Sequence, residues 1–175
     1  ITGGPFDASQ YSSSSVSIKT QQWTVPGSYV VNIPSGAGTI NLEIAGAGGG
    51  GGGGGGIFAS KTGANGGRGE LIVTTMKVSG ASSLKVKVGQ GGAGGLVGLS
   101  NDDSKDISSV FGGTGESSSV EDILARGGTG GGCAYYYLDS DGYGHQRNGT
   151  AATSYGNGGL GGAGASRMTN GSAGN

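Results

Sequence analysis

The chain has 175 residues, of which 45 are glycine and three are proline. A helical bundle is excluded because each glycine inside an α-helix costs about 1 kcal/mol relative to alanine. Collagen is excluded as well, because glycine does not recur strictly at every third position. Charged residues make up 12% of the chain and the net charge is −1. The sequence has no cluster of basic residues of the kind that binds nucleic acid. It also has no apolar run long enough for a transmembrane helix.

Residues 1–22 are rich in serine and are expected to be a linker or junction, followed by one glycine-rich domain over residues 23–175. Within the domain, apolar and polar residues alternate in short runs, which is typical of half-buried strands. The strands predicted in this way are Tyr29–Ile33, Thr39–Ile44, Glu70–Val78 and Ser83–Val88. Together they predict a small antiparallel β-unit over about residues 23–88, into which a glycine run at 46–56 is inserted.

Seven glycine-rich runs alternate with these strands and dominate the second half of the chain. They are 46–56, 63–69, 89–95, 112–115, 127–132, 156–164 and 171–174. Chains without Cβ atoms can form extended threefold helices with a rise of about 3.1 Å per residue, which hydrogen-bond only to neighbouring chains. We therefore predict a mainly β protein with negligible α-helix, in which the β-unit is joined to a packed bundle of polyglycine II-type helices with display loops over about residues 89–175. Disordered glycine runs are the alternative.

The order of the motifs carries a family resemblance that no single glycine motif would. The motifs are Trp23-Thr-Val-Pro26, the strand Ile40–Ile44 before a glycine tract, Gly66-Gly-Arg-Gly-Glu70, Val86-Lys-Val-Gly-Gln-Gly-Gly92, Ser108-Ser-Val-Phe-Gly112 and Ala125-Arg-Gly-Gly-Thr-Gly-Gly-Gly132. Over residues 23–165 this order resembles the glycine-rich domain at the distal ends of bacteriophage tail-fibre and minor tail proteins. It is also similar to the fibre-tip adhesins of T-even-like phages. Ala45 departs from the pattern, because an aromatic residue is frequent there.

The resemblance implies a receptor-binding tip domain at the distal end of a tail fibre, and hence an extracellular location on the virion. Its partner would be a receptor on the bacterial surface, either a loop of an outer-membrane protein or a surface glycan. Fibres of this kind are commonly trimeric, so a homotrimer formed through the fibre is expected. In the related adhesins, packed polyglycine helices display variable loops that recognise the host.

Binding is expected in the segments that connect the glycine runs, because loops on a rigid scaffold are the usual carriers of recognition. Three segments qualify: 57–64, 97–109 and 134–155. The third holds five of the seven tyrosines, which offer large contact area at low entropic cost. The candidate receptor-binding residues are Tyr135, Tyr136, Tyr137, Asp139, Asp141, Tyr143, His145, Arg147, Asn148 and Tyr155, with Asn101 and Asp102 in the second segment. Tyr143 and His145 are expected in a loop, whereas Tyr135 and Tyr137 could instead fill space over the glycine runs.

The sequence contains no complete motif for catalysis or for metal binding. Cys133 is the single cysteine and His145 the single histidine, and neither has a persuasive partner for nucleophilic catalysis. Asp139-Ser-Asp-Gly-Tyr-Gly144 starts like a calcium loop, but no acidic residue follows Asp141 to complete it. We expect no enzymatic activity, no metal and no cofactor. The alternatives to an adhesin are a purely structural cap or spacer and an antifreeze-like bundle, which would require regular Thr/Ala arrays.

Overall fold

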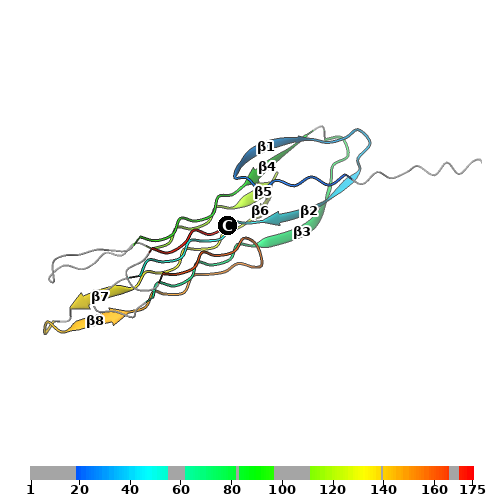
Figure 1. Cartoon of the computed structure of the whole chain (residues 1–175). Coiled ribbons are helices and arrows are strands. Elements are labelled where there is room, and N and C mark those ends of the chain that lie inside the picture. The colour runs from blue at the N-terminus through cyan, green and yellow to red at the C-terminus, as the bar shows by residue number, and fades with distance from the viewer. Residues whose placement is uncertain (1–18, 55–61, 82, 97–110, 139, 166–169) are drawn as a thin grey trace, which may run out of the picture.

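The computed structural model describes residues 19–54, 62–81, 83–96, 111–138, 140–165 and 170–175. Its described part is mainly β, without any helix. The molecule is elongated (Figure 1): two small sheets occupy one end, glycine-rich segments run side by side through the middle, and a hairpin extends from the other end. We refer to these two ends as the sheet end and the hairpin end.

Six strands form the sheet end. β1 (Gly27–Asn32), β4 (Ser83–Val88), β5 (Ser118–Val120) and β6 (Ile123–Ala125) make an antiparallel sheet in the order β1-β4-β5-β6. β2 (Thr39–Ala45) and β3 (Leu71–Lys77) pair separately, also antiparallel. The predicted small antiparallel β-unit is confirmed, because each of the four strands expected from alternation is present within a few residues of its predicted bounds.

The hairpin β5–β6 also belongs to this unit, although it lies later in the chain than the predicted range 23–88. A two-residue turn, Glu121 and Asp122, links its strands, and Glu121 has a positive φ of 48°. The Glu121 N–H donates to the Lys85 carbonyl at 3.0 Å, and Glu121 Oε1 accepts from the Lys85 N–H at 2.5 Å. Three-residue strands are too short for alternation to reveal them, so the sequence did not indicate this hairpin.

The hydrophobic core lies between the two sheets. Its buried residues are Ile44, Val78, Leu84, Val120 and Ala125, and partly buried Ile33, Ala37, Ile40, Leu42, Ile72, Met76, Val86 and Ile123 pack against them. All of them belong to the six strands or to residues next to them. The described large aliphatic side chains therefore stabilise mainly the sheet end, and the glycine-rich segments must be held together differently.

Residues 46–54, here the central segment, donate hydrogen bonds to three other segments in turn. Gly46, Gly49 and Gly52 donate to residues 70, 67 and 64 at 2.8–2.9 Å. The intervening N–H groups follow the same three-residue spacing: residues 47 and 50 donate to 116 and 113, and residues 48 and 51 donate to 175 and 172. In each series the acceptor number falls as the donor number rises. The segments 62–70, 111–117 and 170–175 therefore run antiparallel to the central segment.

The carbonyl groups of the central segment accept hydrogen bonds from three further segments. Residues 92 and 95 donate to 48 and 51; residues 128, 131 and 134 donate to 47, 50 and 53; residues 159, 162 and 165 donate to 46, 49 and 52. Here donor and acceptor numbers rise together, so segments 89–96, 126–134 and 158–165 run parallel to the central segment. Within the described residues, six segments thus surround the central one and pair with the N–H groups of residues 46–52 and the carbonyl groups of residues 46–53.

Hydrogen bonds between neighbours close these six segments into a ring around the central segment. Their order is 62–70, 126–134, 111–117, 89–96, 170–175, 158–165 and back to 62–70. Segments that run parallel and antiparallel to the centre alternate around this ring. One more segment, 148–155, lies outside the ring and hydrogen-bonds to 62–70 and 126–134. We call it the outer segment and the whole assembly the glycine array.

Apart from Ala47, the central segment requires glycine at residues 46–53 because its neighbours approach from every side. A Cβ atom on Gly49 would overlap the carbonyl oxygen of Thr129, and the glycines three residues before and after it meet the same segment. Gly48 and Gly51 face 158–165 in the same way, and Gly50 and Gly53 face 89–96. In the ring, side chains point outward at every third position, as with exposed Gln90, Ala93 and Leu96. The array thus replaces a side-chain core with paired backbone.

Candidate functional site

The directions of the segments bring several chain connections to the hairpin end. The central segment and the three segments parallel to it all run away from the sheets, so the chain leaves the array at this end after residues 54, 96, 134 and 165. It re-enters at residues 62, 111, 148 and 170. The candidate residues Asn101, Asp102 and Asp139, with the segment 97–109, lie outside the described residues. The described part of this end is the hairpin.

The hairpin pairs β7 (Tyr135–Leu138) with β8 (Gly144–Arg147) in antiparallel register. Tyr135 lies opposite Arg147, Tyr136 opposite Gln146, and Tyr137 opposite His145. Most of the candidate residues predicted from the sequence are therefore close neighbours in one element. His145, expected in a loop, lies in a strand instead, because four residues on each side of the turn are enough to form a ladder.

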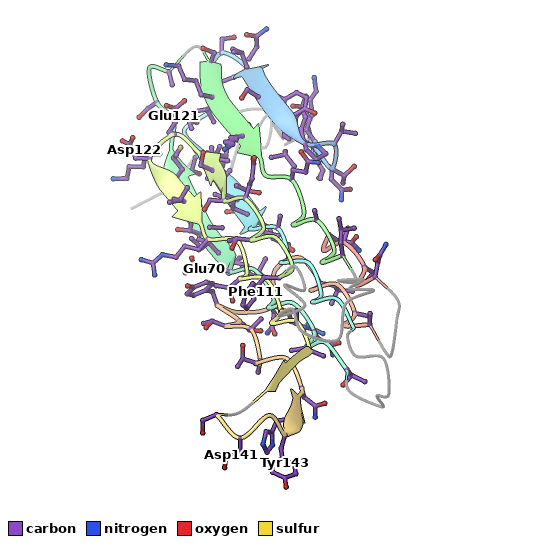
Figure 2. All side chains as sticks on the ribbon, turned by 90° about the vertical axis from the view of Figure 1, so that its left-hand side faces the viewer. Glu70, Phe111, Glu121, Asp122, Asp141 and Tyr143 are labelled. Atoms are coloured by element: carbon purple, nitrogen blue, oxygen red, sulfur yellow. The ribbon has the colours of Figure 1, made fainter. Side chains whose placement is uncertain are left out.

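Among the described residues, the turn of the hairpin lies farthest from the sheets (Figure 1). Gly142 has a φ of 79°, a left-handed conformation that glycine adopts without steric cost. Asp141, Tyr143 and His145 are exposed, and the Tyr143 side chain retains 71% of its accessible surface. Figure 2 shows Asp141 and Tyr143 at the opposite end of the molecule from Glu121 and Asp122. Such a tip is accessible to a large partner.

Two of the predicted site residues belong to the scaffold. Asn148 Oδ1 accepts a hydrogen bond from the Thr62 N–H at 3.3 Å, which fastens the start of the outer segment. The Tyr155 N–H donates to the Arg68 carbonyl at 3.0 Å, near the sheet end, and its side chain is 43% exposed. The structure therefore separates Tyr155 from the other tyrosines, because residues 148–155 run back along the array instead of forming a loop.

The outer segment is held by contacts that sequence reasoning missed. The Thr153 N–H donates to Thr129 Oγ1 at 2.7 Å, and the Thr129 N–H donates to the Thr153 carbonyl at 3.2 Å. Ser154 Oγ accepts from the Arg68 N–H at 2.9 Å. The sequence feature that could have indicated this contact is the run Thr150–Ser154, which contains hydroxyl residues but no glycine. A hydroxyl group can accept or donate a hydrogen bond in place of a backbone group.

Over the described part of the chain, no three His, Cys, Asp or Glu side chains gather into a group that could hold a metal ion. The same residues include no helix with the length and apolar character needed to cross a membrane. Cys133 is buried where β7 leaves the array, in keeping with a small packed thiol.

Comparison with known proteins agrees with the architecture. No curated protein matches the chain. The profile of a protein family described as a glycine-rich domain matches residues 24–175, which leaves out only the serine-rich start and Trp23. The match includes both sheets, the glycine array and the hairpin. The chain therefore belongs to the glycine-rich domain family.

Proposed function

We propose that the chain is the non-enzymatic receptor-binding tip domain of a bacteriophage tail fibre or a related tail protein. The observation that carries the proposal is the hairpin β7–β8, which places tyrosine, histidine and arginine residues at the end of the molecule opposite the sheets. A rigid scaffold with polar aromatic residues at its far end suits adhesion, since tyrosine makes large contacts at low entropic cost. The partner is a receptor on a bacterial surface.

The scaffold in this proposal is a bundle of polyglycine II-type helices. Support comes from the three-residue spacing of the hydrogen bonds made by the central segment, which matches the three residues per turn of such a helix. The bonds run between segments and not within them, as that helix requires. A bundle of this kind is stiff because each rod is fixed by several others, so the hairpin is presented in one orientation.

The polarity of the molecule fits attachment to a fibre through the sheet end. Residues 19–26 precede β1 at that end, where Trp23 and Tyr29 pack with ring centroids 6.5 Å apart and Tyr29 Oη donates to the Val25 carbonyl at 2.7 Å. A shaft joined before these residues would leave the hairpin outermost. In this arrangement the domain sits at the distal end of a trimeric fibre on the virion.

The test uses the purified chain and bacteria that the phage infects. Labelled protein is expected to bind the cells saturably and to block phage adsorption, and replacing residues 135–147 by a Gly-Ser linker is expected to abolish both effects. A variant with Lys87 and Glu116 both changed to alanine, at the sheet end, is the matched control and should bind normally. Absence of saturable binding by the unaltered chain would overturn the proposal and favour the alternative, a structural cap or spacer.

A further inference from the structure

Some asparagine and aspartate residues of the chain are followed directly by glycine. They are Asn65, Asp141, Asn148, Asn157 and Asn170. Such a pair can react with itself, because glycine has no side chain to shield its backbone nitrogen from the preceding side-chain carbonyl group. All of these asparagine and aspartate residues are exposed. Exposure therefore does not distinguish them, and any difference in reactivity must come from the glycine that follows.

The glycines that follow the four asparagines are held in the glycine array by their N–H groups. Residues 66, 149, 158 and 171 donate to the carbonyl groups of residues 162, 62, 69 and 95, respectively, at 2.8–3.0 Å. Two asparagine side chains are bound as well: Asn65 Oδ1 accepts from the Gly164 N–H at 2.8 Å, and Asn148 Oδ1 accepts from the Thr62 N–H at 3.3 Å. Attack by the glycine nitrogen requires its peptide group to rotate towards the asparagine side chain, which breaks these bonds. The array therefore opposes the reaction at all four asparagines.

The aspartate–glycine pair lies in the hairpin turn and not in the array. The Gly142 N–H donates no hydrogen bond to the described part of the chain, and Gly142 is itself exposed. A Cβ atom on Gly142 would meet nothing within 4 Å, whereas a Cβ atom on each of the four array glycines would overlap neighbouring backbone. The peptide group after Asp141 can therefore rotate towards the carboxyl group without displacing another segment.

We propose that Asp141 is the site of spontaneous isoaspartate formation in the folded chain, and that the glycine array protects the four asparagines from the corresponding deamidation. The Gly142 nitrogen bonds to the side-chain carboxyl carbon of Asp141, and the carboxyl oxygen leaves as water with the amide proton to give a cyclic imide. Water then opens this ring at either carbonyl group and yields aspartate or isoaspartate, with no net change in composition. At an asparagine, ammonia leaves in place of the first water.

The product changes the shape of the hairpin turn. Isoaspartate carries the backbone through its side-chain carbon, so it lengthens the link between β7 and β8 by a methylene group. The tip of the hairpin is then the place where the folded chain alters with age, while the array keeps its original residues. Neither reaction depends on the proposed function in host binding.

The test stores the whole folded chain at physiological pH and temperature in heavy-oxygen water and locates the products by peptide mass spectrometry. Opening of the imide takes up one solvent oxygen, so every turnover is marked, and isoaspartyl methyltransferase identifies the isoaspartate. We expect both marks at Asp141, with the four asparagines nearly unchanged. In urea, where the array is unfolded, the same asparagines should deamidate about tenfold faster or more.

Two variants of the turn provide internal comparisons. Asp141→Asn places an asparagine–glycine pair outside the array, and position 141 should deamidate about tenfold faster or more than the four array asparagines of the same folded molecule. Asp141→Glu keeps the charge but requires a larger and less favourable ring, so it should form no imide. An unmarked Asp141 in the stored chain would overturn the modification site. Deamidation in the array as fast as in urea, or as fast as at position 141 of Asp141→Asn, would overturn the protection.

Discussion

Glu70 and Arg126 hydrogen-bond to each other twice at the junction between the sheets and the glycine array. The Glu70 N–H donates to the Arg126 carbonyl at 2.8 Å, and the Arg126 N–H donates to Glu70 Oε2 at 3.0 Å. Glu70 also accepts the Gly46 N–H through its own carbonyl, so it ties the start of β3 to the central segment and to 126–134. One side chain thus joins two architectures that are stabilised in different ways.

Removing the Glu70 carboxylate should loosen this junction. Glu70→Ala leaves the Arg126 N–H without its acceptor, and we expect the free energy of unfolding to fall by about 1 kcal/mol, measured by urea denaturation. Glu70→Gln keeps an acceptor oxygen at the same position and should recover most of the loss. Equal destabilisation by the two variants would show that the hydrogen bond is not responsible.

The central segment already carries one methyl group, at the buried Ala47, but should tolerate none at Gly49. Gly49→Ala places a Cβ against the Thr129 carbonyl, so neighbouring backbone must shift, and we expect a loss of about 3 kcal/mol or more. Gly38 is the matched control, because a Cβ there meets nothing within 4 Å and its φ is not positive. Gly38→Ala should change the stability by less than about 1 kcal/mol. Thermal unfolding of both variants measures the difference, and similar melting temperatures would contradict the close-packed array.

The left-handed backbone of Glu121 should be measurable as strain. Glu121→Ala and Glu121→Gly both remove the acceptor of the Lys85 N–H, and only glycine adopts the observed φ of 48° without steric cost. We therefore expect the glycine variant to be more stable than the alanine variant by about 1 kcal/mol. Denaturant unfolding of the pair isolates this contribution. An alanine variant as stable as the glycine variant would argue against strain in the β5–β6 turn.

The outer segment should open independently of the ring. Thr129→Val removes the acceptor of the Thr153 N–H, and amide exchange is expected to accelerate for residues 149–155 while the central segment keeps its protection. Thr114→Val, at an exposed position on the ring segment 111–117, is the control and should leave these rates unchanged. Hydrogen exchange followed by NMR or mass spectrometry gives the measurement. Faster exchange throughout the chain would mean that the outer segment and the ring form one cooperative unit.

The ion pair between Lys87 and Glu116 should contribute little. Its nitrogen and oxygen are 3.4 Å apart, but the two side chains remain 51% and 53% exposed. Solvent screening and side-chain entropy limit such pairs to about 0–1 kcal/mol. A double-mutant cycle with alanine at both positions should give a coupling below about 0.5 kcal/mol that diminishes further in high salt. A larger coupling would reveal an ordered link between β4 and the array.

Alternation of apolar and polar residues predicted the four longer strands of the sheet end but not its two short ones. Alternation in Thr39–Ile44 and Ser83–Val88 predicted strands that the structure contains, because half-buried strands impose a two-residue period on their side chains. The hairpin β5–β6 was not indicated, since its strands are too short to show a period. At the candidate site, residues 134–155 were expected to form one display loop, whereas the structure forms a hairpin from 135–147 and places Tyr155 on the array.

The sequence by itself determined where the four longer strands β1 to β4 form and where backbone can approach backbone, since a run of glycines admits neighbours at hydrogen-bonding distance on all sides. It did not determine which runs meet, because one glycine run is locally equivalent to another. Only the tertiary structure decided that residues 46–54 lie at the centre, that 148–155 stay outside the ring, and that the hairpin projects at the end opposite the sheets. The physical reason is that every backbone group of the central segment needs a partner, and segments distant in the chain provide those partners only when they assemble together.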